Sequence, residues 1–318
     1  MEAASMKPDL RPMLATIIDK PFDDPNWIFE TKWDGFRLMA EIKDCSASLY
    51  SRNLIDLSSK YPSICGVLRG IGHFAVIDGE LVALNAEGRS RFQLLQNAER
   101  EKVPLRYCVF DLLYLDGEDL RDHPLVERKE MLERILPKDR SLHYSTHVWD
   151  HGIAAFKRAA KAGEEGIMAK LATGRYYSGQ RTREWLKVKA SQGQEVVIVG
   201  FTAPRRSRQY FGSLLLAVRE GKYWRYVGRA GTGFDGATLK SLHGLMVPLI
   251  TTSKPVAETV PDEANTRWVK PKLVGEVKFT EWTSKGEMRH PVFLGLRTDK
   301  KANDVVKEEP KPEAGPVH

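Results

Sequence analysis

Short segments rich in β-branched, aromatic and leucine residues recur along this chain of 318 residues, and they constrain its fold more than any other feature. Segments of this kind are typical of strands. In the first part of the chain the predicted strands are residues 36–42, 47–51, 74–84, 105–115, 166–171 and 185–189. Helical segments lie between several of them, so we predict a mixed α+β domain.

Apolar residues at helical spacing predict the helices of this domain. These are residues 57–68, 92–100, 125–136 and a segment that begins after Asp150 as its N-cap and stops at Gly163. Residues 8–26 are rich in proline and aspartate. We expect them to form an irregular lead-in on the surface.

The small and polar segment 190–193 predicts a hinge before a second domain. Beyond it, strands are predicted at 195–202, 213–219, 222–229 and 274–281, with one helix at 236–250. This pattern suits a small Greek-key barrel of the oligonucleotide-binding kind. We therefore predict domains at 1–190 and 191–300, followed by a disordered tail at 301–318 that is rich in lysine, glutamate and proline.

Composition narrows the class of protein. Lysine and arginine exceed aspartate and glutamate by 49 to 42, a net charge of +7, which favours a polyanionic partner; a mildly basic enzyme without one is the alternative. The three cysteines form no Cys-x-x-Cys pair, so neither a disulfide framework nor a cysteine zinc site is indicated. Without an apolar signal core or membrane span, we expect a cytoplasmic protein with no membrane partner.

Lys32 lies in the charged segment 30–37, between two alternating apolar runs. We interpret it as a nucleophile on a short loop that strands hold on both sides. A lysine attacks only as a neutral amine, and neighbouring cations or a metal lower its pKa; Arg37 is a candidate cation. An exposed lysine in a turn made by Asp34 and Gly35 is the alternative.

Acidic side chains interrupt two of the apolar strands. Alternation places Asp78 and Glu80 on one strand face, where two carboxylates indicate binding of a cation, a metal or ribose hydroxyls. Glu165 would complete a hard-cation site, for which magnesium is suitable. An acidic turn between a helix and a strand is the alternative for Glu165.

Basic side chains follow the same strands. Arg52 ends one strand, where it would reach a phosphate or a ribose, or remain a surface arginine. Lys187 and Lys189 alternate with apolar residues and share one face, so they would neutralise a phosphate in a transition state. A solvated edge strand protected by these lysines is the alternative.

The loop 205–211 combines arginines with aromatics in the second domain. Arg205, Arg206 and Arg208 suit the backbone phosphates of a nucleic acid and the aromatics suit a platform for a base; a flexible charged loop is the alternative. No glycine-rich phosphate loop occurs, so nucleotide chemistry would depend on side chains. The histidines at 143, 147 and 151 would not share one face, and we predict no metal site there.

In their order from Lys32 to Lys300, these motifs resemble those of the ATP-dependent DNA ligases of the covalent nucleotidyltransferase superfamily. In that family the lysine of Lys-x-Asp-Gly attacks the α-phosphate of ATP, releases pyrophosphate and holds AMP through a phosphoramide. The resemblance puts this role on Lys32. It implies a DNA ligase that seals 5′-phosphate/3′-hydroxyl nicks through a lysyl-AMP and a DNA-adenylate.

The resemblance also implies roles around the nucleotide. Arg37 and Arg52 would contact the ribose and later the 5′-phosphate of the nick, and Glu80 would contact ribose or metal. Phe110 matches the aromatic residue that stacks on adenine. Glu30 occupies the position that the family places near the purine edge.

Further implied roles concern phosphates and metal. Lys187 and Lys189 match the pair that grips the α-phosphate, and Glu165 would help to hold a divalent ion, magnesium or manganese. The segment 297–300 resembles the last family motif, which the oligonucleotide-binding domain swings over ATP to orient the pyrophosphate. Arg297, Asp299 and Lys300 would then contact ATP, and the start of a charged tail is the alternative.

The segments 30–37 and 289–297 most resemble bacterial ligases of end joining and repair. Such enzymes often work beside the end-binding protein Ku. The resemblance therefore implies nicked or broken duplex DNA and a Ku-like protein as partners, a monomer, and a place at the nucleoid of the bacterial cytoplasm. An RNA capping guanylyltransferase and a noncatalytic DNA-binding module remain the alternatives, and preference for GTP would distinguish the first.

Overall fold

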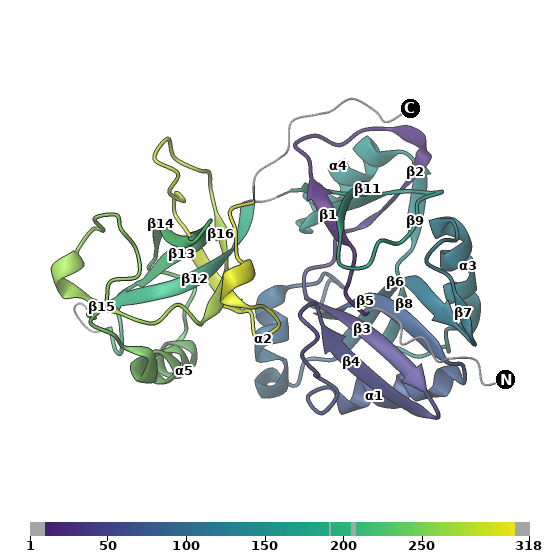
Figure 1. Ribbon diagram of the computed structural model, residues 1–318, viewed down its shortest axis with the longest axis horizontal. Helices are drawn as coiled ribbons and strands as arrows, with labels where there is room; N and C mark the ends of the chain where they lie inside the picture. The colour runs from purple at the N-terminus through teal and green to yellow at the C-terminus, as the bar shows by residue number, and fades with distance from the viewer. Residues whose placement is uncertain (1–9, 191, 205–207, 309–318) are drawn as a thin grey trace. The chain divides into compact units, whose positions relative to one another are not determined.

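The computed structural model describes residues 10–190, 192–204 and 208–308, and these form two compact units (Figure 1). One unit ends at Ala190 and the other at Glu308. Within the described residues, no helix is long and apolar enough to cross a membrane. Each unit has a hydrophobic core of its own.

The first unit contains two sheets. In spatial order, one sheet consists of β1 (Leu14–Ile17), β11 (Arg181–Lys189), β10 (Gly166–Leu171), β2 (Asp24–Thr31) and β9 (His147–Asp150). β1 runs parallel to β11, and the other pairs are antiparallel. Helix α4 (Gly152–Ala162) covers one face of this sheet, because Ala155 and Ala159 pack against alternate apolar residues of the strands.

The other sheet consists of β4 (Ser46–Ser51), β3 (Phe36–Lys43), β5 (Ala75–Ala83), β6 (Leu105–Leu115) and β7 (Glu118–Asp119), with β8 (Leu142–Tyr144) parallel to β6. Its helices are α1 (Pro62–Leu68), the short 3₁₀ helix η1 (Arg69–Ile71), α2 (Phe92–Glu101) and α3 (Leu125–Ile135). Trp185 of the first sheet packs with Met39, Val76 and Phe110 of this one. The inner faces of the two sheets therefore share a core.

The second unit is a barrel. Its strands are β12 (Gln192–Thr202), β13 (Leu214–Glu220), β14 (Tyr223–Ala230), β15 (Thr266–Trp268), β16 (Val274–Phe279) and β17 (Val292–Leu296). The sheet order is β14-β13-β12-β16-β17, and β15 pairs with β12. The amide of Phe293 donates to the carbonyl of Thr232 at 3.0 Å, which joins β17 to the chain after β14 and closes the sheet.

Short helices complete the second unit. They are α5 (Gly236–Met246) and the 3₁₀ helices η2 (Val247–Leu249), η3 (Glu263–Asn265) and η4 (Ala302–Asp304). Leu242 and Met246 of α5 join the barrel core. The predicted mixed α+β fold followed by a barrel of the oligonucleotide-binding type is confirmed.

Several boundaries differ from the prediction; β11 begins at Arg181 rather than at residue 185, and β12 begins at Gln192, inside the predicted hinge 190–193. The helix predicted from residue 57 begins only at Pro62, which occupies its first turn. Asp150 belongs to β9, and His151 is the N-cap of α4; the amide of Ile153 is satisfied instead by Oδ1 of Asp23, at 2.9 Å. The irregular lead-in expected at 8–26 contains β1 and the start of β2.

The tail expected to be disordered is ordered in its described part, residues 301–308. Val305 is buried in the barrel core, and its carbonyl accepts a hydrogen bond from the amide of Arg219 at 2.6 Å. Gln194 bonds to both Val306 and Glu308. The prediction of disorder followed from the charged composition of the segment and overlooked Val305, whose side chain is buried in the barrel core. Residues 309–318 lie outside the described residues.

Candidate active site

Lys32 follows β2 in a loop whose members are each bonded to a different element. Its own amide donates to the carbonyl of Gly166 at 3.0 Å. The next residue, Trp33, donates its indole N–H to Oγ of Ser145 at 3.0 Å. Because these bonds reach β10 and the chain after β8, the loop has little freedom to move the lysine.

The last two residues of the loop explain its sequence. The amide of Asp34 donates to Oγ of Ser90 at 3.1 Å, and Oδ2 of Asp34 accepts from the amide of Phe92 at 3.0 Å, at the start of α2. A side chain at Gly35 would overlap the carbonyl of Leu81 on β5. The Asp34 side chain therefore fixes the loop to the start of α2. Gly35 is required because the loop contacts the backbone of the second sheet there.

The amine of Lys32 forms an ion pair with Glu165, and the lysine side chain is 18% exposed. Burial lowers the pKa of Lys32 and Lys189 lowers it further, but Glu165 and Glu80 outweigh them, so the pKa is raised above its ordinary value. Arg37, the predicted candidate, is not among the groups that lower this pKa, and the side chains around Lys32 together favour the protonated amine.

Arg37 is not the cation beside Lys32. Its guanidinium forms a two-bond pair with Asp78, at 2.9 and 2.5 Å, and Tyr176 donates to the same carboxylate at 2.6 Å. Asp78 is fully buried and holds the pKa of Arg37 above its ordinary value despite burial of the guanidinium. Asp78 thus positions Arg37, whereas Glu80, two residues on, interacts with Lys32.

The strand β11 carries its lysines as predicted. Leu186 and Val188 are buried under α4, while Lys187 and Lys189 are half-buried on the other face. Lys187 pairs in register with Met168 of β10. Both lysines thus face the side that Trp185 shares with the second sheet.

Phe110, on β6, is only 7% exposed. The amine of Lys170 lies 4.2 Å from the centre of its ring, and the guanidinium of Arg37 lies at 5.3 Å. Lys170 is also 4.3 Å from the Trp185 ring. The Phe110 ring, which the resemblance implies to stack on adenine, is therefore in contact with the cations of Lys170 and Arg37 in this structure.

Glu30, predicted to lie near the purine edge, is buried between two lysines. Its carboxylate forms ion pairs with Lys129 at 2.9 Å and Lys170 at 3.0 Å, and it accepts from the Ser145 hydroxyl at 3.1 Å. Burial raises its pKa, but the two ammonium groups outweigh burial and the pKa is lowered. Ser145 also accepts from Trp33, so this network holds the loop of Lys32.

Sequence reasoning missed the cations of this network and of a second one beside it. Arg128 forms a fully buried two-bond pair with Asp111, at 2.7 and 2.8 Å. On α3, Arg128 and Lys129 occupy the stripe between Leu125 and Leu132 at helical spacing. Two cations on an otherwise apolar helix face are a signal that could have identified them.

The pKa of Lys170 is lowered to about 8. Burial is the main cause, the charge of Lys129 lowers the pKa further, and the carboxylate of Glu30 raises it only in part.

Arg52 lies in a turn after β4 that Ser51 organises. The Ser51 hydroxyl accepts from the amides of Asn53 and Ile55 at 3.3 and 3.1 Å, and its carbonyl accepts from Leu54 at 2.8 Å. Arg52 itself is half-buried. Among the described residues, no contact joins the Arg52 side chain to Lys32 or to the carboxylates beside it.

In the second unit, the predicted ATP contacts are bonded to acids of the same unit. Arg297 pairs with Asp299 at 2.9 and 2.8 Å and with Glu276 at 3.2 Å, and Lys300 pairs with Glu195 at 2.7 Å. Asp299 is 0% exposed. Asp299 therefore positions Arg297 here rather than presenting its carboxylate to a ligand.

Of the predicted DNA-binding arginines, only Arg208 lies within the described residues. Its guanidinium donates to the carbonyl of Gly231 at 2.7 Å and lies 5.4 Å from the centre of the Phe234 ring. Arg205 and Arg206 lie outside the described residues.

The structure thus brings together Lys32, Glu80, Glu165 and Lys189. Glu80 and Glu165 supply two carboxylates beside the amine, and the described residues contain no group of three potential metal-binding side chains. A divalent ion at this place would therefore need further ligands from the substrate or from water. Magnesium commonly binds to one or two carboxylates plus substrate phosphates, and this donor set fits that pattern.

Comparison with known proteins decides the family. Residues 12–189 match the family described as the ATP dependent DNA ligase domain, and residues 207–300 match the ATP dependent DNA ligase C terminal region. This chain belongs to the ATP-dependent DNA ligase family. The matched ranges include the Lys32 loop, the two facing sheets and the barrel segment that ends at Lys300.

Individual members of the ligase family give the same result. The chain is 38% identical over 317 residues to the multifunctional non-homologous end joining protein LigD of Pseudomonas aeruginosa, and the match covers 96% of this chain and 37% of the relative. The LigD of Mycobacterium tuberculosis is 36% identical over 305 residues, covering 94% and 40%. The chain therefore spans well under half of these relatives.

Two solved structures resemble this ligase-family chain at 36% identity. A mycobacterial DNA ligase D complexed with ATP and MES has a TM-score of 0.72, and the ligase domain of M. tuberculosis LigD has a TM-score of 0.53. Each comparison covers 94% of this chain and 98% of the other. The predicted family is confirmed, and the relatives named for end joining agree with the predicted resemblance to bacterial ligases of that type.

Proposed function

We propose that this chain seals 5′-phosphate/3′-hydroxyl nicks in DNA with ATP in three steps. The amine of Lys32 attacks the α-phosphorus of ATP, pyrophosphate leaves and a phosphoramide to AMP forms. An oxygen of the nick's 5′-phosphate then attacks the same phosphorus and releases the lysine. Finally the 3′-hydroxyl attacks the 5′-phosphorus and AMP leaves.

The observation that carries this proposal is the fixed loop of Lys32 beside Glu165 and Glu80. Bonds to three other elements fix the backbone, so the amine can be held in line with a phosphate. The amine must lose its proton before it attacks, because its pair with Glu165 keeps it protonated. Proton loss is thus part of the first step.

Glu80 and Glu165 would hold a divalent ion, magnesium or manganese, together with ATP phosphates. When bound, the ion supplies positive charge that neutralises phosphate and carboxylate oxygens. Lys187 and Lys189 would contact the α-phosphate and stabilise charge as the phosphorus is attacked.

Other residues would bind the nucleotide and the nick. Arg37, which Asp78 positions, and Arg52 would contact ribose and then the 5′-phosphate. Phe110 would stack on adenine after Lys170 moves from its ring, and Glu30 would act near the purine edge through its lysine network. Arg297, Asp299 and Lys300 would orient the pyrophosphate in the first step, for which their bonds to Glu276 and Glu195 must rearrange.

The relatives named for non-homologous end joining support a role in DNA repair. We propose nicked or broken duplex DNA as substrate, a Ku-like end-binding protein as partner, and a monomer in the bacterial cytoplasm. Arg205, Arg206 and Arg208 would bind backbone phosphates. The domain at 1–190 would then carry out the nucleotidyl transfer, and the domain at 191–300 would hold the DNA.

The test is the intact mass of the chain after removal of bound AMP with pyrophosphate, followed by incubation with magnesium and either ATP or GTP. The parent chain should gain one AMP, and Lys32→Ala should gain none. Lys157→Ala, an exposed lysine on α4, is the matched control and should gain AMP.

Other results would redirect the assignment. An adduct on Lys32→Ala would exclude Lys32 as nucleophile, and a GMP adduct would indicate a capping guanylyltransferase. If neither nucleotide forms an adduct, the DNA-binding module without catalysis becomes the better hypothesis. Sealing of a nicked duplex by the AMP form would then establish the later steps.

A further inference from the structure

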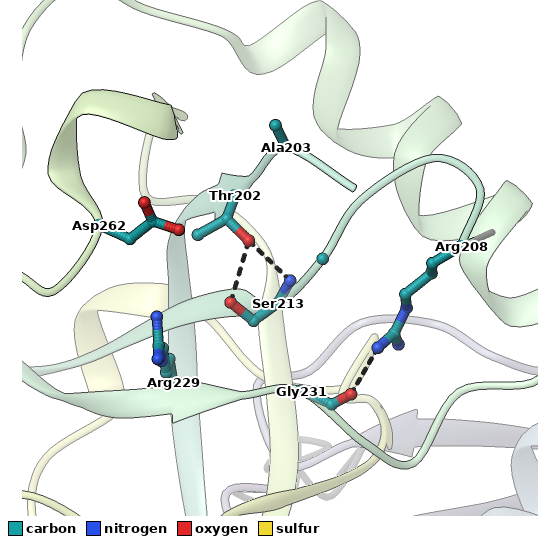
Figure 2. Close-up of a pocket in the computed structure, with 8 residues that line it drawn as sticks. Thr202, Ala203, Arg208, Ser213, Arg229, Gly231 and Asp262 are labelled. Atoms are coloured by element: carbon teal, nitrogen blue, oxygen red, sulfur yellow. Dashed lines mark hydrogen bonds between the residues drawn. The ribbon is translucent and has the colours of Figure 1, made fainter. Parts of the chain in front are cut away.

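A pocket of about 320 Å³ opens in the barrel, where β12 and β14 end (Figure 2). Thr202, Ser213, Arg208, Arg229 and Asp262 contribute polar groups to its lining. Its volume is at the lower end of the range for small-ligand pockets, roughly 300–1,000 Å³. It belongs to the second unit alone and involves none of the residues proposed to bind ATP.

Two buried hydroxyls form the floor of this pocket. Oγ1 of Thr202 accepts from the amide of Ser213 at 3.0 Å, and the two hydroxyl oxygens lie 3.1 Å apart. Within the part of the chain that the structure describes, only one of the two hydroxyl hydrogens is used between them, so the other can donate to a ligand. Gly212 permits this approach, because a side chain there would lie 2.7 Å from Oγ1 of Thr202.

Two arginines lie on opposite sides of the hydroxyl pair in Figure 2. Arg208 uses one N–H for the carbonyl of Gly231 and keeps other donors of its guanidinium. Arg229 is exposed at the end of β14. Asp262 lies on the same side as Arg229 in this view, and its Oδ1 accepts from Asn265 at 2.7 Å.

Two guanidinium groups and one carboxylate leave one net positive charge. A phosphodiester carries one negative charge per phosphate, and arginine and hydroxyl donors are the usual contacts to its oxygens. We propose that this pocket binds one backbone phosphodiester of the DNA substrate, with Arg208, Arg229 and the Thr202–Ser213 hydroxyls as donors. This inference rests on the proposed function and specifies where the barrel holds DNA.

The position of the pocket favours DNA backbone over a small anion. It adjoins the chain between the first two barrel strands, β12 and β13, and loops at this place bind nucleic acids in barrels of this type. The bound phosphate would fix the register of the duplex without reading its sequence. Affinity should therefore depend on salt and not on the bases beside the nick.

The experiment measures the dissociation constant for a nicked duplex with a 5′-phosphate at several salt concentrations. Arg229→Gln should weaken binding roughly three- to tenfold near 0.1 M salt and reduce the slope of log affinity against log salt by about 0.9. Lys222→Gln, which removes one charge at the opposite end of the same hairpin, should change affinity less than about twofold.

Asp262→Asn provides a change of opposite sign. Asparagine tolerates the φ of 64° at this position, and loss of the carboxylate should tighten binding. Arg229→Lys keeps the charge and should keep the salt slope of the parent. Unfolding midpoints of all variants confirm that the barrel is intact.

Equal effects of Arg229→Gln and Lys222→Gln, or weaker binding by Asp262→Asn, would overturn the inference. Formation of the AMP adduct by the parent chain is measured separately. A parent that forms the adduct while Arg229→Gln binds DNA normally would leave the proposed function in place and remove only this site. A parent that forms no adduct would contradict the proposed function itself.

Discussion

At the scale of single residues, each position of the loop 32–35 has a different role. Lys32 presents the amine, Trp33 connects to the buried network of Glu30 through Ser145, and Asp34 bonds to the first residue of α2. Gly35 allows the loop to touch the backbone of β5. The position of one lysine thus depends on three neighbouring residues and on their contacts with the rest of the domain.

Gly35→Ala should lower the rate of AMP-adduct formation at least tenfold. Its new methyl group would overlap the carbonyl of Leu81, and the loop must shift to relieve the overlap. The measurement is adduct mass against time. Gly66→Ala in α1, where the nearest side-chain atom would be 3.6 Å away, is the control and should form the adduct at the parent rate. Equal rates for both variants would contradict this account.

Glu195 predicts a pH dependence of stability. Burial raises its pKa, but Lys300 and Arg297 outweigh burial and lower it from 4.5 to about 2. Since the folded pKa is the lower one, the stabilisation is complete above pH 4.5 and is lost as the pH falls through 2. Glu195→Gln should therefore cost about 2–3 kcal/mol at pH 7 and less at pH 3, as urea unfolding would show. A cost that does not change with pH would contradict the ion pair.

At the scale of elements, α3 departs most from the ordinary pattern of an amphipathic helix. Arg128 and Lys129 replace apolar residues on the face that it buries. Each is neutralised by a carboxylate from a strand, Asp111 on β6 and Glu30 on β2. The helix therefore joins both sheets through ion pairs as well as through apolar contacts.

Lys129→Met should destabilise the first unit by about 3–5 kcal/mol, because it removes one of the two cations that compensate the buried Glu30. Adding Glu30→Gln to this variant should recover part of the loss. Urea unfolding of both single variants and the double variant measures the coupling. Additive effects would show that the pair does not interact in the folded protein.

Many of the longer elements were predictable, whereas short strands such as β7, β15 and β17 and the partners of buried charges were not. Strand β6 was predicted with its observed bounds because a long apolar run allows few other structures. The burial of Leu186 and Val188 on the strand face opposite the half-buried Lys187 and Lys189 followed from alternation. The partners of Glu30 come from distant segments, and no local pattern relates them; the same is true of Arg37 and Asp78.

At the scale of the whole molecule, the separate hydrophobic cores of the two units imply two units of stability. The barrel core includes Phe293 and Val305, and the core between the sheets of the first unit includes Trp185. Proteins with separate cores commonly unfold in more than one step. A single unfolding free energy would therefore describe this chain poorly.

Phe293→Ala should destabilise the barrel by about 3–5 kcal/mol, since this ring is completely buried and stacks on Phe234 at 5.1 Å. Hydrogen exchange measured by mass spectrometry should then show faster exchange across β12–β17, with the strands of the first unit unchanged. Faster exchange in both units to the same extent would mean that they unfold as one.

The segment 301–308 has a practical consequence for anyone who shortens this protein. β12 pairs with β13 only as far as Ala217, and the carbonyl of Val305 occupies the amide of Arg219 beyond that point. A recombinant fragment that stops at Lys300, where the last family motif ends, would uncover this strand edge beside the buried Val218. Uncovered edges of this kind recruit the strands of other copies, so such a fragment should aggregate whereas one that continues through Glu308 should not.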